Sequence, residues 1–137
     1  YKLDIIQAPF NIFDRRLKKS GWLSRLVQQG TEVHVRSVFL QGLLLMSPTN
    51  RPSKFNRWNE LWKQWDSWTS KNNISPLQAC LSFVLSELEI DRVIVGVDNL
   101  EQLKEILYAT KIIQPEIPED LYCNDINLIN PARWDSL

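Results

Sequence analysis

Polar residues and glycines follow three short apolar runs of this chain, and they are of the types that bind amides and phosphates. Gln7 lies near the end of the first run, Ser37 lies near the end of the second with Gly42 after it, and Gly96 lies near the end of the third with Asp98 after it. A glutamine side chain can donate to and accept from a flat carboxamide at once. Loop amides beside a glycine can hold a pyrophosphate, and the unpaired amides of a helix N-terminus attract anions. Taken alone, each feature also fits a purely structural role, which for Gln7 is a hydrogen bond to neighbouring backbone.

The three apolar runs predict the scaffold that positions these residues. They are Leu3–Ala8, Thr31–Phe39 and Arg92–Val97, and each is followed by a run with helical periodicity. Strands that alternate with helices predict parallel βαβ units in an α/β fold, and the short apolar first strand is expected to be buried on both faces. Three such units leave an open sheet with two bare edges. Because a (β/α)8 barrel takes about 250 residues, the 137 residues predict a single partial domain, residues 1–137, of a larger barrel.

Cap residues and periodicity predict where the helices begin and end. Ser20 is the expected cap of a helix over 21–29, and Ser53 is the expected cap of a helix over 53–69. Ser75 followed by a proline starts a third helix, and Asn99 with Gln102 resembles a capping box for a helix over 100–110. In the helix over 53–69, aromatic residues recur at helical spacing, and we favour a packing stripe against the barrel wall over ligand stacking.

A basic cluster and a single histidine are candidate binding features of the sequence. Arg15, Arg16, Lys18 and Lys19 form a short basic cluster, which favours a solvated loop and helix start over an anion contact. His34 is the single histidine and lies inside a strand run, so we interpret it as a structural side chain.

The composition argues against several classes of function. Sixteen Lys and Arg balance sixteen Asp and Glu, so the chain has no basic field for a nucleic acid. No apolar stretch reaches the length of a membrane span, so no membrane partner is expected. Cys80 and Cys123 lack metal-ligand spacing, which predicts no metal site and favours a reducing, cytoplasmic setting. Cys80 lies in an apolar helical run and is expected to be a small buried residue.

Three motifs together resemble the C-terminal part of the aldo/keto reductase family. They are QAPFNIFDRR, RSVFLQGLLL and VIVGVDNLEQL, and the resemblance extends to about Thr110. It implies the C-terminal portion of a (β/α)8 TIM barrel, with about three βα units and a C-terminal tail. It also implies an oxidoreductase that binds NADP or NAD and reduces a small carbonyl substrate. The RSVFLQGLLL loop and the tail INPARW are similar to those of bacterial reductases tied to sugar modification.

The resemblance carries over a set of cofactor contacts residue by residue. Gln7 would contact the nicotinamide amide. The pyrophosphate would be lined by Ser37, Phe39, Gln41, Gly42 and Leu43. The residues around the adenosine would be Gly96, Asp98, Gln102 and Glu105.

Three positions depart from the family pattern. Arg36 stands where members often have an aromatic residue under the nicotinamide, and its guanidinium plane can also stack on a ring. Val38 replaces a proline. Asp98 stands where NADP-preferring members place a cation for the 2′-phosphate, and a carboxylate there would bind a ribose hydroxyl instead. The choice between NAD and NADP stays open.

The resemblance assigns no catalytic residue to this chain. The Tyr, Asp, Lys and His of the family come from its first four strands, and we transfer no role to Tyr1 or His34. One hypothesis is therefore the cofactor-binding half of a reductase whose catalytic half is absent here, with no turnover and low stability in isolation. The alternative is a non-catalytic half-barrel module that pairs with itself or with a partner through its bare strand edges.

Overall fold

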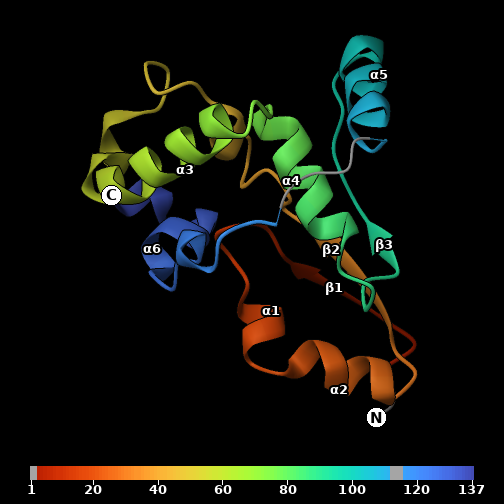
Figure 1. The fold of residues 1–137 in the computed structure, drawn as a ribbon. Coiled ribbons are helices and arrows are strands. Elements are labelled where there is room, and N and C mark those ends of the chain that lie inside the picture. The colour runs from red at the N-terminus through yellow and green to blue at the C-terminus, as the bar shows by residue number, and fades with distance from the viewer. Residues whose placement is uncertain (1–2, 112–115) are drawn as a thin grey trace.

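The computed structural model describes residues 3–111 and 116–137 and contains a parallel sheet of three strands, with α3 (Asn59–Lys71), α4 (Pro76–Leu85) and α6 (Ile126–Ile129) to one side of it (Figure 1). The order is β1 (Ile5–Pro9), β2 (Glu32–Arg36) and β3 (Arg92–Val93). Both pairs are parallel, with Gln7 opposite His34 and His34 opposite Arg92. The predicted βαβ arrangement is confirmed, but each strand is shorter than predicted. A strand extends only as far as its ladder partner does, and β3 pairs with β2 through two residues.

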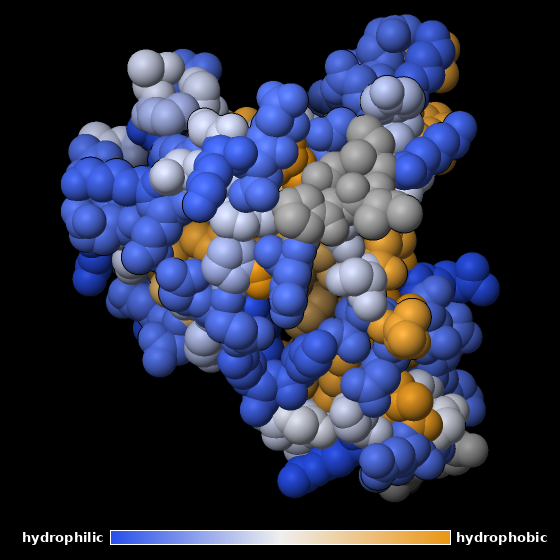
Figure 2. Space-filling view, viewed as in Figure 1, coloured by the Kyte–Doolittle hydropathy of each residue, from blue (hydrophilic) through white to orange (hydrophobic). Residues whose placement is uncertain are grey.

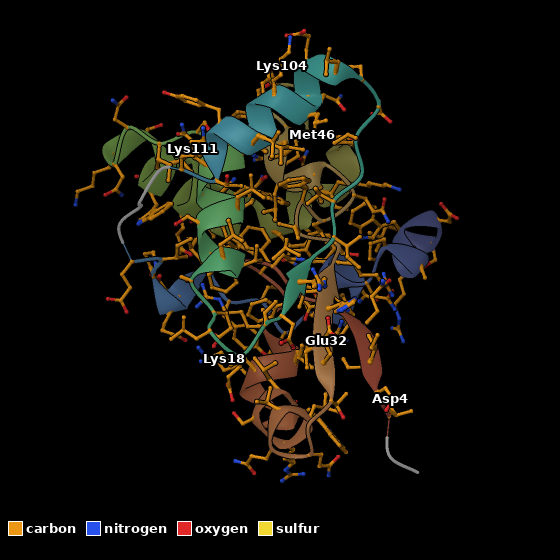
Figure 3. All side chains as sticks on the ribbon, turned by 90° about the vertical axis from the view of Figure 1, so that its right-hand side faces the viewer. Asp4, Lys18, Glu32, Met46, Lys104 and Lys111 are labelled. Carbon is orange, nitrogen blue, oxygen red and sulfur yellow. The ribbon has the colours of Figure 1, made fainter. Side chains whose placement is uncertain are left out.

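Helices cover one face of this sheet and leave the other face open. Val33 and Val35 of β2 are buried, whereas Arg36 of the opposite face is exposed. On β1, Ile5 is 54% exposed and Gln7 is also exposed. The prediction that the first strand is buried on both faces is therefore wrong, because no described element lies on its second face. Figure 3 looks onto the sheet, with the three strands side by side and Glu32 on β2.

The helices follow the strands as predicted, with differences at their starts. Their bounds are α1 (Arg16–Lys19), α2 (Trp22–Gln28), α3 (Asn59–Lys71), α4 (Pro76–Leu85), α5 (Leu100–Ala109) and α6 (Ile126–Ile129). Shorter 3₁₀ turns are η1 (Leu43–Leu45), η2 (Ser53–Trp58), η3 (Glu119–Leu121) and η4 (Pro131–Ser136). The capping box of α4 is confirmed, since Ser75 Oγ accepts from the Gln78 amide at 3.2 Å and Gln78 Oε1 accepts from the Ser75 amide at 3.0 Å.

Two predicted helix starts are wrong. Ser20 ends α1, and the N-cap of α2 is Gly21, whose φ of +77° makes a sharp turn between the two short helices. Ser53 begins the 3₁₀ turn η2 rather than an α-helix, and α3 starts only at Asn59. A cap residue identifies where a helical turn begins, but tertiary packing decides which kind of helix follows.

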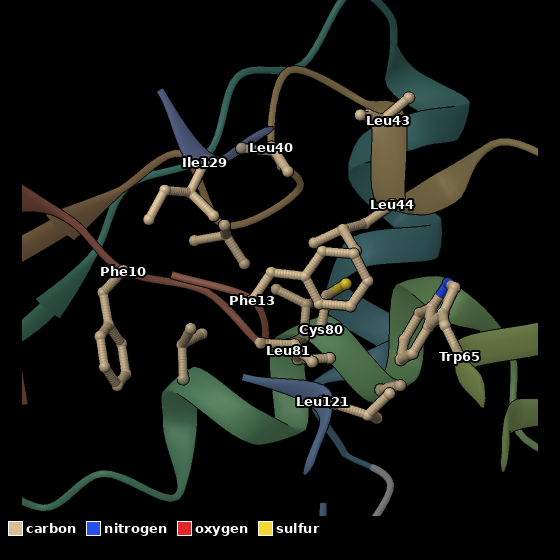
Figure 4. Packing of buried hydrophobic residues seen from close by; sticks show 14 of the residues in the cluster. Phe10, Phe13, Leu40, Leu43, Leu44, Trp65, Cys80, Leu81, Leu121 and Ile129 are labelled. Carbon is tan, nitrogen blue, oxygen red and sulfur yellow. The ribbon is translucent and has the colours of Figure 1, made fainter. Parts of the chain in front are cut away.

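Two tryptophans of α3 belong to the hydrophobic core, which agrees with the predicted packing role. They pack on the β1–α1 loop and not on a barrel wall. Trp62 and Trp65 are buried, and both contact Phe13 of the β1–α1 loop, with ring centroids 5.1 and 6.2 Å apart. Figure 4 shows Phe13 and Trp65 in this cluster with Leu44 and Cys80. The aromatic stripe thus has a packing role in the described residues, and it packs on the β1–α1 loop instead of a barrel wall.

The tail is held by Trp134. Its ring meets Phe55 edge-on with centroids 4.8 Å apart, and its indole N–H donates to the Leu128 carbonyl at 2.9 Å. An indole ring buries apolar area and keeps one polar atom that needs a partner, and both requirements are met here. The C-terminal segment is therefore part of the same packed body.

Arg15 is not the solvated residue that its sequence context predicts. It is 3% exposed, its Nε donates to the Ile12 carbonyl at 2.8 Å, and its Nη2 donates to the Pro118 carbonyl at 2.9 Å. The guanidinium also lies 4.9 Å from the centroid of the Phe83 ring and pairs with Glu119. The planar group thus ties the β1–α1 loop to the C-terminal segment.

The three other members of the basic cluster also pair with carboxylates. The pairs are Arg16 with Asp14, Lys18 with Glu87, and Lys19 with Glu119. The pairing of Lys19, with a smaller effect from Arg15, holds the pKa of Glu119 below its ordinary value. The cluster therefore has a structural role, and its charges are already matched by acidic side chains.

Cys80 is fully buried in α4, which confirms the expectation of a small apolar residue. Burial away from water strongly disfavours a thiolate and raises the pKa of the Cys80 thiol far above its ordinary value. Cys123 is half-buried, and burial raises the pKa of its thiol as well. Neither cysteine has the environment of a reactive thiol.

Candidate functional site

A groove of about 680 Å³ lies at the C-terminal ends of β2 and β3. Its walls come from the loop between β2 and η1, the chain beyond β3, one residue of α4, and the first turns of α5. This is the edge at which open α/β sheets and barrels bind ligands, and the volume is that of an ordinary small-molecule site. Figure 3 shows α5, marked by Lys104, above the strand ends.

Most of the residues predicted to bind a cofactor lie together in this groove. The predicted residues that line it are Arg36, Ser37, Phe39, Gln41, Gly42, Gly96, Asp98, Gln102 and Glu105. The remaining lining residues are mainly apolar and include Val38, Leu45, Leu77, Ile94 and Ile106. Segments separated by more than fifty residues in sequence thus meet at one site, because parallel strands end at the same edge of the sheet.

The β2–η1 loop turns tightly through left-handed backbone. Leu40, Gln41 and Gly42 have φ values of 48°, 54° and 81° in succession. Such values suit glycine and are unfavourable for the other two residues, so the surrounding structure must hold this turn in place. The amides of Phe39, Gln41, Gly42 and Val38 have no acceptor among the residues that the structure describes. Successive free amides in a turn form a concavity that binds anions, and this one opens onto the groove.

Asn11 connects this loop to β1. Its side chain is 1% exposed, and its Oδ1 accepts from the amides of Phe13 and Asp14 at 3.0 and 2.9 Å. Its Nδ2 donates to the Ser37 carbonyl at 3.0 Å, and Ser37 has a φ of 58°. Asn11 is therefore a positioning residue for the groove that our sequence reasoning missed. The signal was an asparagine just after a strand run and a proline, since an asparagine side chain accepts from backbone amides two residues on in an Asx turn.

The start of α5 forms the opposite wall. Asn99 Oδ1 accepts from the Gln102 amide at 2.9 Å, and Gln102 Oε1 accepts from the Asp98 amide at 2.8 Å. The predicted cap by Asn99 is confirmed, whereas the side chain of Gln102 reaches one residue further back than a capping box requires. Two amides that a bare helix N-terminus would offer to an anion are thus occupied by side chains of the chain itself.

Two of the predicted contact residues lie outside the groove. Gln7 projects from the open face of the sheet, beside His34. The side chain of Leu43 is 1% exposed in the core, and its amide donates to the Leu40 carbonyl at 3.0 Å. Leu43 begins the turn η1, which rotates its side chain away from the groove. Their predicted contacts with a cofactor stay predictions.

His34 takes part in a charge network on the open face of the sheet. Glu32 Oε1 lies 2.8 Å from His34 Nε2 and accepts from Arg92 Nε at 3.2 Å. Hydrogen bonding by His34, with help from Arg92, holds the pKa of Glu32 below its ordinary value. The histidine is thus engaged within the sheet, in line with a structural role.

The tyrosines and possible metal ligands of the described residues lie away from the groove or apart from one another. Of the tyrosines in residues 3–111 and 116–137, Tyr108 is 67% exposed on α5 and Tyr122 lies against Lys19, and neither lines the groove. Tyr1 falls outside the described residues. No group of three or more His, Cys, Asp or Glu residues within the described ranges could hold a metal ion. In those ranges, no helix has both the length and the apolar character of a membrane span.

Comparison with known proteins identifies the family. Residues 1–118 match the profile of the Aldo/keto reductase family, and the chain therefore belongs to that family. No match was found among proteins of curated function. The family adopts the TIM-barrel fold and in general carries out NAD(P)H-linked carbonyl reduction. The parallel sheet and the groove at its C-terminal edge agree with that family architecture.

Proposed function

We propose that this chain is the cofactor-binding, C-terminal portion of an NAD(P)H-dependent carbonyl reductase barrel. The observation that carries the proposal is the groove at the strand ends, with loop amides at Val38, Phe39, Gln41 and Gly42 that have no acceptor among the described residues. Free amides in a turn suit the pyrophosphate that both nicotinamide dinucleotides share. The groove volume and its mixture of apolar and polar lining residues also suit a nucleotide.

Each groove residue has a definite task under this proposal. The amides of Gln41 and Gly42 bind the pyrophosphate together with the Ser37 hydroxyl, which Arg36 Nη1 approaches to 3.3 Å. The guanidinium of Arg36 lies flat against the nicotinamide ring or contacts a phosphate. Gln7 lies outside the groove, on the open face of the sheet, and under this proposal it holds the carboxamide from that side. When bound, the cofactor supplies the hydride for reduction of the carbonyl carbon.

The proton donor of the reaction comes from strands outside this chain. Two features of the described residues support this part of the proposal. Neither described tyrosine reaches the groove, and His34 is bonded to Glu32 on the open face of the sheet. A family barrel has eight strands, so five further strands would close the sheet and cover that open face. The isolated chain is therefore expected to bind nucleotide without turnover.

Replacing Arg36 with glutamine tests the loop side of the groove. Loss of one charge-assisted contact or of the stacked plane is expected to weaken NADH binding about tenfold by isothermal titration calorimetry. Arg36→Lys keeps the charge and removes the plane, so an intermediate affinity would point to stacking and full affinity to charge alone.

Arg92→Gln is the matched control for this substitution. Arg92 lies on the same open face of the sheet, pairs with Glu32 and does not line the groove. Its replacement is expected to leave the NADH affinity unchanged. If Arg36→Gln and Arg92→Gln reduce the affinity equally, the groove is not the binding site.

A second candidate function is that of a non-catalytic module that pairs with another copy or a partner. The exposed apolar residues favour it, and Figure 2 shows several of them near the strands. Leu100, Leu107 and Tyr108 of α5 and Ile5 of β1 are all more than half exposed. A surface of this kind is unusual for an isolated monomer. Measurement of the mass by light scattering over a range of concentrations distinguishes a pairing module from a monomeric cofactor domain.

A further inference from the structure

We infer that the groove discriminates between the two nicotinamide dinucleotides and takes NAD(H), whose adenosine ribose carries no phosphate. The inference rests on the proposed function and concerns the α5 wall of the same groove. Three observations carry it: the separation of charges along the lining, the occupied amides at the start of α5, and the free amides of the opposite wall.

The charged side chains of the groove are separated by sign. Arg36, on the β2 side, is the one basic residue among the described residues that line it, whereas Asp98 and Glu105 both belong to the α5 side. Lys104 of α5 is paired with Glu101 at 2.9 Å, and neither of them lines the groove. A phosphate on the α5 side would therefore face two carboxylates without a basic lining residue beside it.

The α5-side residues that line the groove offer no free first-turn amide to offset these charges, since the amides of Asp98 and Gln102 are bonded and Asn99, Leu100 and Glu101 do not line it. Unpaired amides at a helix start ordinarily attract anions. Here the Asp98 amide is bonded to Gln102 Oε1, and the Gln102 amide is bonded to Asn99 Oδ1. Within the described residues, groove-lining amides without an acceptor lie on the loop wall, at Val38, Phe39, Gln41 and Gly42, and beyond β3, at Val95 and Gly96. One wall thus accepts the pyrophosphate, and the other wall is unfavourable for a second phosphate.

A carboxylate is a good partner for a ribose diol and a poor one for a phosphate. It accepts hydrogen bonds from ribose hydroxyls, which is how acidic residues select NAD in dinucleotide-binding sites, and it repels a 2′-phosphate at short range. Asp98 is therefore the specificity-determining residue, and Glu105, one or two turns along α5, adds to the same negative potential. Both side chains are exposed, so solvent moderates the effect.

Titration calorimetry of the full chain with NADH and with NADPH at low ionic strength tests the inference. We expect NADH to bind about tenfold more tightly than NADPH. Asp98→Lys is expected to remove or invert this ratio, chiefly through a higher affinity for NADPH. Glu101→Lys makes the same change of charge in the first turn of α5 but outside the groove, and it is expected to keep the ratio.

The outcomes separate this inference from the function on which it rests. NADPH binding as tight as NADH binding or tighter, in the unaltered chain, overturns the preference while leaving the nucleotide site in place. A ratio unchanged by Asp98→Lys, or changed equally by Glu101→Lys, overturns the assignment to Asp98. Failure of the chain to bind either dinucleotide overturns the proposed function and this inference with it.

Discussion

Replacing Trp65 with alanine is expected to lower the free energy of unfolding by about 4 kcal/mol, the largest single effect that we predict for this chain. Trp65 is 0% exposed, contacts Phe13 edge-on and stacks on Trp68 with centroids 6.1 Å apart. Its removal leaves a cavity between the β1–α1 loop and α3, which cannot fully collapse because Phe13 and Trp68 are held by their own segments. Urea unfolding followed by circular dichroism measures the change, which would be a large part of a typical domain stability of about 5–15 kcal/mol.

The matched control is Trp22→Ala. Trp22 is 53% exposed on α2 and lies against Arg25, so its removal is expected to cost about 1 kcal/mol or less. If Trp65→Ala does not fold, Trp65→Phe keeps most of the volume and is expected to cost about 2 kcal/mol. Equal losses at Trp65 and Trp22 would contradict the packing of α3 on the β1–α1 loop.

Replacing Asn11 with alanine is expected to cost about 3 kcal/mol of stability and to weaken nucleotide binding as well. The change removes three hydrogen bonds from a residue that is 1% exposed. It leaves the Phe13 and Asp14 amides without their acceptor, and the Ser37 carbonyl keeps the Leu40 amide as a donor. Because Ser37 begins the strained loop of the groove, its release disorganises the pyrophosphate wall. Urea unfolding and NADH titration of the folded protein measure the two effects separately.

Asn11→Asp isolates the bond to Ser37. A carboxylate still accepts from the Phe13 and Asp14 amides but cannot donate to the Ser37 carbonyl, which lies 3.0 Å from Asn11 Nδ2. The Asn11→Asp protein is therefore expected to keep the turn at Phe13 and Asp14 and to lose the contact with Ser37, with weaker NADH binding as the result. Asn72→Ala is the control, since Asn72 is exposed and bonds only to the Trp68 carbonyl of its own helix. An Asn11→Ala protein with unaltered NADH affinity would contradict the positioning role.

The sequence was sufficient to predict those elements that depend on contacts between residues close together in the chain. The start of α4 follows from Ser75, Pro76 and Gln78, whose contacts span three residues, and its capping box forms as predicted. The grouping of Ser37, Gly42 and Gly96 around one groove follows from topology, because all lie just beyond parallel strands. Prediction succeeded here because one local rule or one topological rule determines the outcome.

Long-range contacts decided what the sequence did not predict. Arg15 is buried because Pro118 and Glu119 come back to the β1–α1 loop, and nothing near Arg15 in the sequence indicates that return. The strands are shorter than their apolar runs because the hydrogen-bonded pairing of neighbouring strands stops early. In β2 it stops at Arg36, since the chain turns at Ser37, which has a φ of 58°. Leu43 looks like a loop residue in the sequence, but the turn η1 places its side chain in the core. Each difference arises from packing that a periodicity pattern cannot encode.

The most direct test of the central claim is a map of amide chemical shifts by NMR as NADH is added to the full chain. The account predicts saturable changes at the loop amides Val38, Phe39, Gln41 and Gly42 and at the facing residue Gly96, with the remainder of the sheet little affected. Changes that instead gather in the smaller hollow beside α1 and α2, lined by Ala8, Asp14, Ser20 and Trp22, would contradict it, as would the absence of any saturable change.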